Sequence, residues 1–396
     1  VFLQPLQTGK ISLPLMAYFD NNATTRPFPS SQSAYAEALQ ESWFNPSSPS
    51  RASARVRAKL NGAREKLAGT IGVPLENITF TSGSTEANNA TLAHAARSAQ
   101  PEAQALVSSI EHPSVSESAH HWFSDRVQIM PAEPSGVIDL ERLSDLLDQL
   151  PCLAIVCVMA ANNETGVLQP WLDAAQLCRD RGVRFHCDAT QWVGKLPAND
   201  LAGCSSLCAS AHKFGGPKGV GLLASAEPHP FLLGGSQENG RRGGTENYPG
   251  IEAMTVALHS ASDHLSEFPQ RSAWRDSFEE TMLGRFEGIK VIGSTVPRLW
   301  NTSALVMPDF ENLRYVGKLD KLGYEVSTGS ACSSAVAKQS QVSLAMGLSE
   351  SEAKRVIRIS SYVDQREEDW SGLASAFEQA RAELKRDETQ SSVISL

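Results

Sequence analysis

The sequence has no run of about 18 consecutive apolar residues, the length that a helix needs to cross a bilayer. It also has no excess of basic residues. Its 35 Lys and Arg against 44 Asp and Glu give a formal net charge of −9, which offers no general attraction for nucleic acid or an anionic membrane. The first residues show no long apolar stretch with a small-residue cleavage site, as a secretory signal would. We therefore expect a cytoplasmic protein that binds neither nucleic acid nor a membrane directly.

Cysteine pairs of the Cys-x-x-Cys type are also missing, and the total of seven cysteines is odd. All but one lie between Cys152 and Cys208, mostly in apolar segments, and are expected to be small buried residues in a reducing compartment. A zinc site made of Cys204, Cys208 and His186–Cys187 would match no common ligand spacing. No metal is therefore expected.

The remaining cysteine, Cys332, has different neighbours. It lies in Thr328–Ser334, a segment of small and polar residues with no apolar run that could bury the thiol. A cysteine exposed in such a segment can react as a thiolate. Cys332 is therefore a candidate nucleophile rather than a packing residue.

Short apolar runs alternate with helical patterns through the first two thirds of the chain. The predicted strands are Ile78–Thr81, Ala105–Ile110, Val127–Met130, Leu153–Met159, Val183–Cys187 and Leu207–Ser210. Strands that alternate with helices predict an α/β fold, with a mostly parallel, seven-stranded-type sheet flanked by helices.

At 396 residues the chain is too long for one ordinary core, and its pattern changes near residue 275. We expect a large domain over residues 26–275, and a smaller α+β domain formed by residues 1–25 and 276–396. In the smaller domain, Ser349–Ile359 and Gln365–Leu384 are predicted helices with a short strand between them.

Polar side chains follow several of the predicted strands, at the sheet edge where doubly wound folds bind ligands. They are Ser84, Thr85, His112, Asn163, Asp188, Gln191, His212 and Lys213. The loop Ser82–Asn89 joins a strand to a helix, so its backbone N–H groups and hydroxyls can form an anion site. A capping box with Ser84 or Thr85 as the cap is the alternative, and the two interpretations are compatible.

Lys213 lies between small or apolar residues and a glycine-rich turn, in Ser210–Gly221. A lysine in a crowded apolar place has a lowered pKa and can serve as an amine nucleophile, so Lys213 is a candidate Schiff-base lysine. An ordinary loop lysine before a tight turn is the alternative.

Pyridoxal 5'-phosphate needs an amine, a carboxylate for its ring nitrogen, a flat cover for its ring, and anion donors for its phosphate. The sequence offers a candidate for each of these, in the same order: Lys213, Asp188, His112 and the Ser84–Thr85 loop. Ser210 or His212 would lie beside the phosphate. Gln191 and Asn163 are placed to hydrogen-bond the ring hydroxyl. Each assignment is weak alone, but together they favour this cofactor.

Seven segments together resemble the NifS/IscS-type cysteine desulfurases, which are fold-type I, class-V aminotransferase-like enzymes. The segments are Ser82–Asn89, Glu111–Pro113, Asn162–Gly166, Asp188–Gln191, Ser210–Lys213, Arg241–Thr245 and Ser327–Cys332. The resemblance runs from Tyr18 to about Ser361, nearly the whole chain.

The resemblance implies a homodimer that carries pyridoxal phosphate on Lys213. The implied phosphate contacts are Ser84, Thr85, Ser210 and His212, with Thr245 reaching the phosphate bound by the other copy. It also implies that Arg358 and Asn163 bind the substrate carboxylate and that Asn22 lines the same pocket.

The implied reaction converts L-cysteine to L-alanine. Lys213 would remove the Cα proton, His112 would be a candidate acid or base, and Cys332 would take the sulfur as a persulfide. The sulfur would then pass to an acceptor protein. An iron–sulfur scaffold, tRNA thiolation and DNA phosphorothioation are all open destinations.

The chain departs from the family pattern after its Asn-Pro-x-Ser loop, where Arg51 takes the place of a common histidine. It also lacks the Arg-x-Gly-His-His-Cys signature of the SufS-like branch. Two other functions stay open: a cystine or selenocysteine lyase, which need not use Cys332, and a scaffold that keeps the fold without the chemistry.

Overall fold

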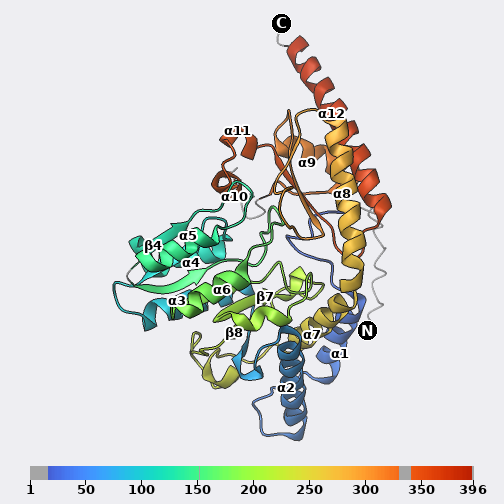
Figure 1. Cartoon of the computed structure of the whole chain (residues 1–396). Helices are drawn as coiled ribbons and strands as arrows, with labels where there is room; N and C mark the ends of the chain where they lie inside the picture. The colour runs from blue at the N-terminus through green and yellow to red at the C-terminus, as the bar shows by residue number, and fades with distance from the viewer. Residues whose placement is uncertain (1–16, 151, 330–339, 395–396) are drawn as a thin grey trace, which may run out of the picture.

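The computed structural model describes residues 17–150, 152–329 and 340–394, and its centre is a seven-stranded sheet (Figure 1). The strands are β2 (Ile78–Thr81), β3 (Gln104–Ser108), β4 (Val127–Met130), β5 (Leu153–Cys157), β6 (Arg184–Asp188), β7 (Ser206–Ser210) and β8 (Gly221–Ser225). Their spatial order is β2-β8-β7-β6-β5-β3-β4. The strands from β3 to β7 are parallel, whereas β8 pairs antiparallel with both of its neighbours. The predicted α/β fold with a mostly parallel sheet is confirmed.

Strand β8 is absent from the sequence-based prediction, which treats its start as part of a glycine-rich turn. It returns antiparallel beside β7, pairing Ser210 with Gly221. An antiparallel partner needs a short connection rather than a crossover helix, so the strand–helix alternation gives no sign of it.

Helices cover both faces of this sheet. They are α1 (Pro29–Glu41), α2 (Arg51–Ile71), α3 (Ser84–Ser98), α4 (Pro113–Phe123), α5 (Leu140–Gln149), α6 (Trp171–Asp180) and α7 (Tyr248–Asp263). Alternate residues of a strand point to opposite faces. Accordingly, Val107 and Ile155 pack in a core with α3 and α4, while Leu106 and Val156 belong to the larger core with α2, α6 and α7. Burial on both faces explains why these strands are continuously apolar.

A second sheet has the order β12-β10-β9 and is antiparallel. Its strands are β9 (Lys290–Val291), β10 (Thr302–Val306) and β12 (Val356–Ser360), and nearby β1 (Ala17–Tyr18) pairs with β11 (Tyr324–Glu325). The long helices α8 (Phe268–Arg285) and α12 (Glu367–Ile394) run side by side, and α9 (Asn312–Lys321) packs against α12 (Figure 1). Phe278, Tyr315 and Phe377 lie in their shared core. The division at residue 275 stays a prediction, and α8 runs through that position.

The predicted helix over Ser349–Ile359 is wrong. After α10 (Gln341–Ala345), the chain forms the short helix α11 (Glu350–Ala353) and then strand β12. All five residues of β12 are buried, so no polar alternation marks it as a strand. The β-branched residues Val356, Ile357 and Ile359 fit a pleated sheet better than a helix.

Among the residues that the structure describes, no helix combines the length and the apolar character needed to cross a bilayer.

The turn after Lys213 generates a testable prediction. Gly215 has φ +83°, and a Cβ at this position would overlap the ring of Phe28. Replacing Gly215 with Ala should lower the free energy of unfolding by at least about 2 kcal/mol, because a left-handed backbone cost is added to a steric overlap. Thermal and urea unfolding measure the change.

Gly219→Ala is the matched control, because Gly219 has φ +77° but nothing within 4 Å of its Cβ position. Gly219→Ala should lower the free energy of unfolding by about 1 kcal/mol, because only the cost of the left-handed backbone applies there. If both variants lose the same amount of unfolding free energy, the proposed overlap of the new methyl group in Gly215→Ala with Phe28 is contradicted.

Candidate active site

A cavity of about 320 Å³ opens beyond the carboxyl ends of the parallel strands. The predicted site residues that line it are Asn22, Ser84, Thr85, His112, Asn163, Asp188, Gln191, Ser210, His212, Lys213 and Arg358. They come from the N-terminal segment, from the start of α3 after β2, from the ends of β3, β5, β6 and β7, and from β12. Segments far apart in the sequence therefore converge on one cavity, as the strand-end pattern predicts.

Lys213 ends the short 3₁₀ helix η4 (Ala211–Lys213), which follows β7 directly. Its Nζ donates hydrogen bonds to the carbonyl oxygens of Asn22, at 2.6 Å, and Ala23, at 2.8 Å. Thr25 secures the same turn, since its backbone N–H donates to the carbonyl of His212 at 2.8 Å. The amine is thus held at the cavity wall by the N-terminal segment.

Asp188, the last residue of β6, is a buried carboxylate in the cavity wall. Burial alone would raise its pKa, but hydrogen bonds from Thr190 and Asn88 outweigh burial and hold the pKa below its usual value. Thr190 donates its backbone N–H to Oδ1 at 3.0 Å, and Asn88 donates Nδ2 to Oδ2 at 2.9 Å. Asp188 therefore stays ionised and can pair with a cationic ring nitrogen.

A polar relay behind Asp188 is absent from the sequence-based prediction. Asn88 Oδ1 bonds to His186 Nε2 at 2.8 Å, and His186 Nδ1 bonds to Ser206 Oγ at 2.9 Å. Burial lowers the pKa of His186 to about 4, so this imidazole is neutral. His186 thus orients Asn88 toward Asp188.

In the part of the chain that the structure describes, no three metal-ligating side chains form a metal-binding group.

His112 is the N-cap of α4 and reaches the cavity from the end of β3. Its Nδ1 accepts a hydrogen bond from the backbone N–H of Ser114 at 3.1 Å, so the ring proton resides on Nε2. Burial lowers the pKa of His112, and Lys213 lowers it further against the opposing effect of Asp188. A neutral, flat imidazole therefore faces the cavity.

The N-terminus of α3 forms another part of the cavity wall. The capping residue is Gly83, with no side-chain cap, so the alternative of a Ser84 or Thr85 cap is wrong. Ser84 instead forms a hydroxyl cluster, accepting from Thr190 Oγ1 at 2.6 Å and from Ser210 Oγ at 3.0 Å. Hydroxyl groups at an uncapped helix N-terminus suit an anion such as phosphate.

His212 lies beside the amine and contacts the N-terminal segment. Its Nδ1 lies 3.2 Å from Thr24 Oγ1. Burial lowers its pKa to about 4, and the neighbouring Lys213 contributes in the same direction. His212 is therefore a neutral hydrogen-bonding group rather than a cation.

Gln191 and Asn22 share a network with Lys195, a residue absent from the sequence-based prediction. Gln191 donates Nε2 to the carbonyl of Asn22 at 3.0 Å. Lys195 Nζ donates to Asn22 Oδ1 at 2.8 Å and also to Gln191 Oε1. Lys195 is completely buried. A lysine four residues after Gln191, between a glycine and a leucine, gives no sign in the sequence that it is buried.

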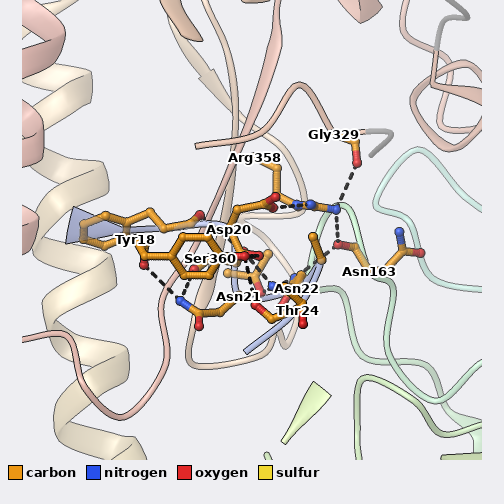
Figure 2. Close-up of polar contacts among 12 residues, drawn as sticks. Tyr18, Asp20, Asn21, Asn22, Thr24, Asn163, Gly329, Arg358 and Ser360 are labelled. Carbon is orange, nitrogen blue, oxygen red and sulfur yellow. Dashed lines mark hydrogen bonds and ion pairs between the residues drawn. The ribbon is translucent and has the colours of Figure 1, made fainter. Parts of the chain in front are cut away.

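Arg358 lies on β12, almost completely buried, at the junction of several segments (Figure 2). Its guanidinium forms an ion pair with Asp20 at 2.5 Å. The other terminal nitrogen donates to the carbonyls of Gly329 at 3.0 Å and Asn163 at 3.2 Å. Among the described residues the buried Nε has no hydrogen-bond partner, which leaves a donor for a ligand.

One predicted site residue of the described part of the chain is not brought into this cavity. Thr245 is exposed and is not among the residues that line it. Cys332 lies outside the described residues. Their predicted roles therefore stay predictions.

The comparisons with known proteins agree with this geometry. A family model described as class-V aminotransferase matches residues 17–373. A cysteine desulfurase of Sinorhizobium fredii is 36% identical over 352 residues, which cover 87% of this chain and 90% of that protein. The solved structure of a NifS-like protein has a TM-score of 0.85 at 30% identity, covering 93% of this chain and 99% of that chain.

A second solved structure, described as SspA in complex with cysteine, has a TM-score of 0.74 at 28% identity. The match covers 87% of this chain and 98% of that chain. The predicted resemblance to NifS/IscS-type enzymes is confirmed. The chain belongs to the class-V aminotransferase family and, within it, to the cysteine desulfurases.

Proposed function

We propose that this protein is a pyridoxal-phosphate-dependent cysteine desulfurase that converts L-cysteine to L-alanine and transfers the sulfur to Cys332. The observation that carries the proposal is the cavity that joins the amine of Lys213, the ionised Asp188 and the neutral His112. Its chemistry fits the cofactor, because an amine, a buried carboxylate, a flat ring and an uncapped helix N-terminus face one space.

Each part of the cofactor has a matching group in the cavity. Lys213 would hold the aldehyde, Asp188 would pair with the ring nitrogen, and His112 would cover the ring. The phosphate would lie at the N-terminus of α3, with contacts from Ser84, Thr85, Ser210 and His212. Gln191 and Asn163 would serve the ring hydroxyl. When bound, the cofactor supplies a ring that stores the electron pair left after a proton leaves Cα.

The side chains of this chain would move the protons. The Nζ of Lys213 would be the base that takes the Cα proton of the substrate. The carbonyl oxygens of Asn22 and Ala23 hold Nζ at the cavity wall, which limits its freedom. His112 Nε2 is a second site that can give or accept a proton, since Nδ1 is engaged by Ser114.

Arg358, with Asn163 and Asn22, would bind the substrate carboxylate. The Asp20 ion pair and two backbone carbonyls orient the guanidinium, and Nε keeps a donor for the incoming carboxylate. A related structure holds cysteine, which supports this substrate class.

Sulfur transfer would use the thiolate of Cys332. The thiolate attacks the sulfur of the substrate and the carbon–sulfur bond breaks. The electron pair of that bond goes to the carbon, which takes up one proton, equal to the one that the thiol gave up, and becomes the methyl group of alanine. The product is a persulfide on Cys332, so cysteine plus thiol gives alanine plus persulfide with atoms balanced. The role of Cys332 is supported by its small, polar neighbours in the sequence.

We further propose a cytoplasmic homodimer, with residues 26–275 as the cofactor-binding domain and residues 1–25 and 276–396 as the smaller domain that carries Cys332. Thr245 would reach the phosphate bound by the other copy, which is supported by its exposure at the end of a glycine-rich loop. The persulfide would pass to an acceptor protein, in iron–sulfur cluster assembly or in thiolation.

The central experiment incubates the purified protein with pyridoxal phosphate and L-cysteine and measures alanine and protein persulfide. Wild type should form both. Cys332→Ser should lose persulfide and cysteine turnover, and Lys213→Ala should lose turnover together with borohydride-trapped cofactor. Cys152→Ser, a change at another cysteine, is the matched control and should keep activity. Continued alanine or pyruvate formation by Cys332→Ser would instead favour a cystine or selenocysteine lyase.

Asp188→Asn tests the ring partner. The amide carries no charge, so the ring nitrogen loses its anionic partner and turnover should fall by about 100-fold or more. Cofactor binding through Lys213 should persist, as absorbance and borohydride trapping would report. Turnover within a few fold of wild type would contradict the role of Asp188.

Asp20→Asn tests the orientation of Arg358. Loss of the anionic partner of the buried Arg358 guanidinium should raise KM for cysteine by about tenfold, because the guanidinium is no longer held in one position. Asp364→Asn is the matched control, since Asp364 pairs with Arg26 at 3.9 Å on the surface, where a pair contributes little. An unchanged KM in Asp20→Asn would count against this positioning.

A further inference from the structure

Lys195 is a completely buried lysine that the proposed reaction does not use. It lies in the turn after β6, where its neighbours secure the backbone. The carbonyl of Lys195 accepts a hydrogen bond from Trp300 Nε1 at 3.0 Å, and the preceding carbonyl, of Gly194, accepts one from the hydroxyl of Tyr362 at 3.3 Å. Gly194 has φ +75°, and a Cβ there would overlap Phe214. The turn therefore holds the lysine side chain in one position, directed at Asn22 and Gln191.

The side chain of Lys195 ends on two amide oxygens. Nζ donates to Asn22 Oδ1 at 2.8 Å and to Gln191 Oε1. A neutral amine has two N–H groups, so these two acceptors match its donors, whereas an ammonium would have a third. Burial lowers the pKa of Lys195 well below its usual value, and the cationic Lys213 and Arg358 act in the same direction. The bonds to the two amides need no positive charge.

Both amides that Lys195 contacts belong to the active site. With its oxygen held by Lys195, Gln191 turns its nitrogen toward the carbonyl of Asn22, and Gln191 lines the cavity. Asn22 Oδ1 also accepts from Asn301 Nδ2 at 3.2 Å, so its nitrogen faces Thr302 Oγ1 and the carbonyl of Asn163. The carbonyl of Asn22 is one of the two that accept hydrogen bonds from Lys213 Nζ.

We propose that Lys195 is a positioning residue, which holds the amides of Gln191 and Asn22 so that Gln191 presents N–H groups, not its oxygen, to an acceptor atom of the ligand in the cavity. Lys195 touches neither the cofactor nor the substrate. It acts on the cofactor through Gln191, whose amide nitrogen also donates to the carbonyl of Asn22. The inference rests on the proposed function, because it concerns how pyridoxal phosphate is held.

A double-mutant cycle tests the inference. Wild type, Lys195→Met, Gln191→Leu and the double variant are stripped of cofactor, and the dissociation constant for pyridoxal 5'-phosphate is measured by equilibrium dialysis. Lys195→Met and Gln191→Leu should each weaken binding by about tenfold. The double variant should bind no worse than Gln191→Leu, because Lys195 acts through an amide that is already gone. Lys385→Met, the same change at an exposed lysine of α12, should bind as wild type does.

The cycle separates positioning from general destabilisation. A structural defect would weaken binding equally with and without Gln191, so equal losses in both backgrounds would overturn the inference. Unchanged binding by Lys195→Met would overturn it as well. Thermal midpoints of the cofactor-free variants are measured alongside. If Lys195→Met does not fold, Lys195→Leu, which also lacks an N–H donor in its side chain, takes its place in the cycle under the same criterion.

The outcome also separates this inference from the proposed function. If wild type binds pyridoxal phosphate on Lys213 but the losses of cofactor affinity in Lys195→Met and Gln191→Leu add up in the double variant, the inference is overturned and the proposed function stands. Wild type that takes up no cofactor on Lys213, shown by borohydride reduction and peptide mapping, would overturn the proposed function and the inference with it.

Discussion

The active site depends on one asparagine near the N-terminus. Asn22 donates its backbone N–H to Ser360 Oγ of β12 at 2.9 Å and its side-chain amide to Thr302 Oγ1 of β10 at 2.9 Å. Its carbonyl accepts from Gln191 and from Lys213, both of which follow strands of the large sheet. One buried residue therefore ties the two sheets together at the cavity. Buried polar groups need partners, so this arrangement is stable when every member is present.

Burial also determines which groups of the site carry charge. Asp188 stays ionised, because hydrogen bonds from Thr190 and Asn88 outweigh the cost of burial. His112 and His212 are pushed toward the neutral form by burial. The same low dielectric that neutralises the histidines strengthens the interaction of the carboxylate with a cationic ligand. The cavity therefore combines one fixed negative charge with neutral rings.

Sequence reasoning located the strand-end residues well and the tertiary network poorly. Asp188, His112 and Lys213 each follow a recognisable apolar strand, and chemistry-bearing residues at strand ends meet at one sheet edge. The ion pair of Asp20 with Arg358 joins residues 338 positions apart, and no local pattern encodes such a pairing. The sequence predicts a helix at Arg358, whereas the structure has strand β12 there. A strand buried on both faces shows no alternation of apolar and polar residues that would identify it.

By itself the sequence determined the α/β class, because local periodicity predicts alternating strands and helices, and its motifs carry the resemblance to the family that the comparisons confirm. The tertiary structure decided which polar groups are partners. Lys195 appears in the sequence as one more lysine, yet the fold buries it between Gln191 and Asn22. Burial and hydrogen bonding are properties of packing between distant segments, so they emerge only when the chain is folded.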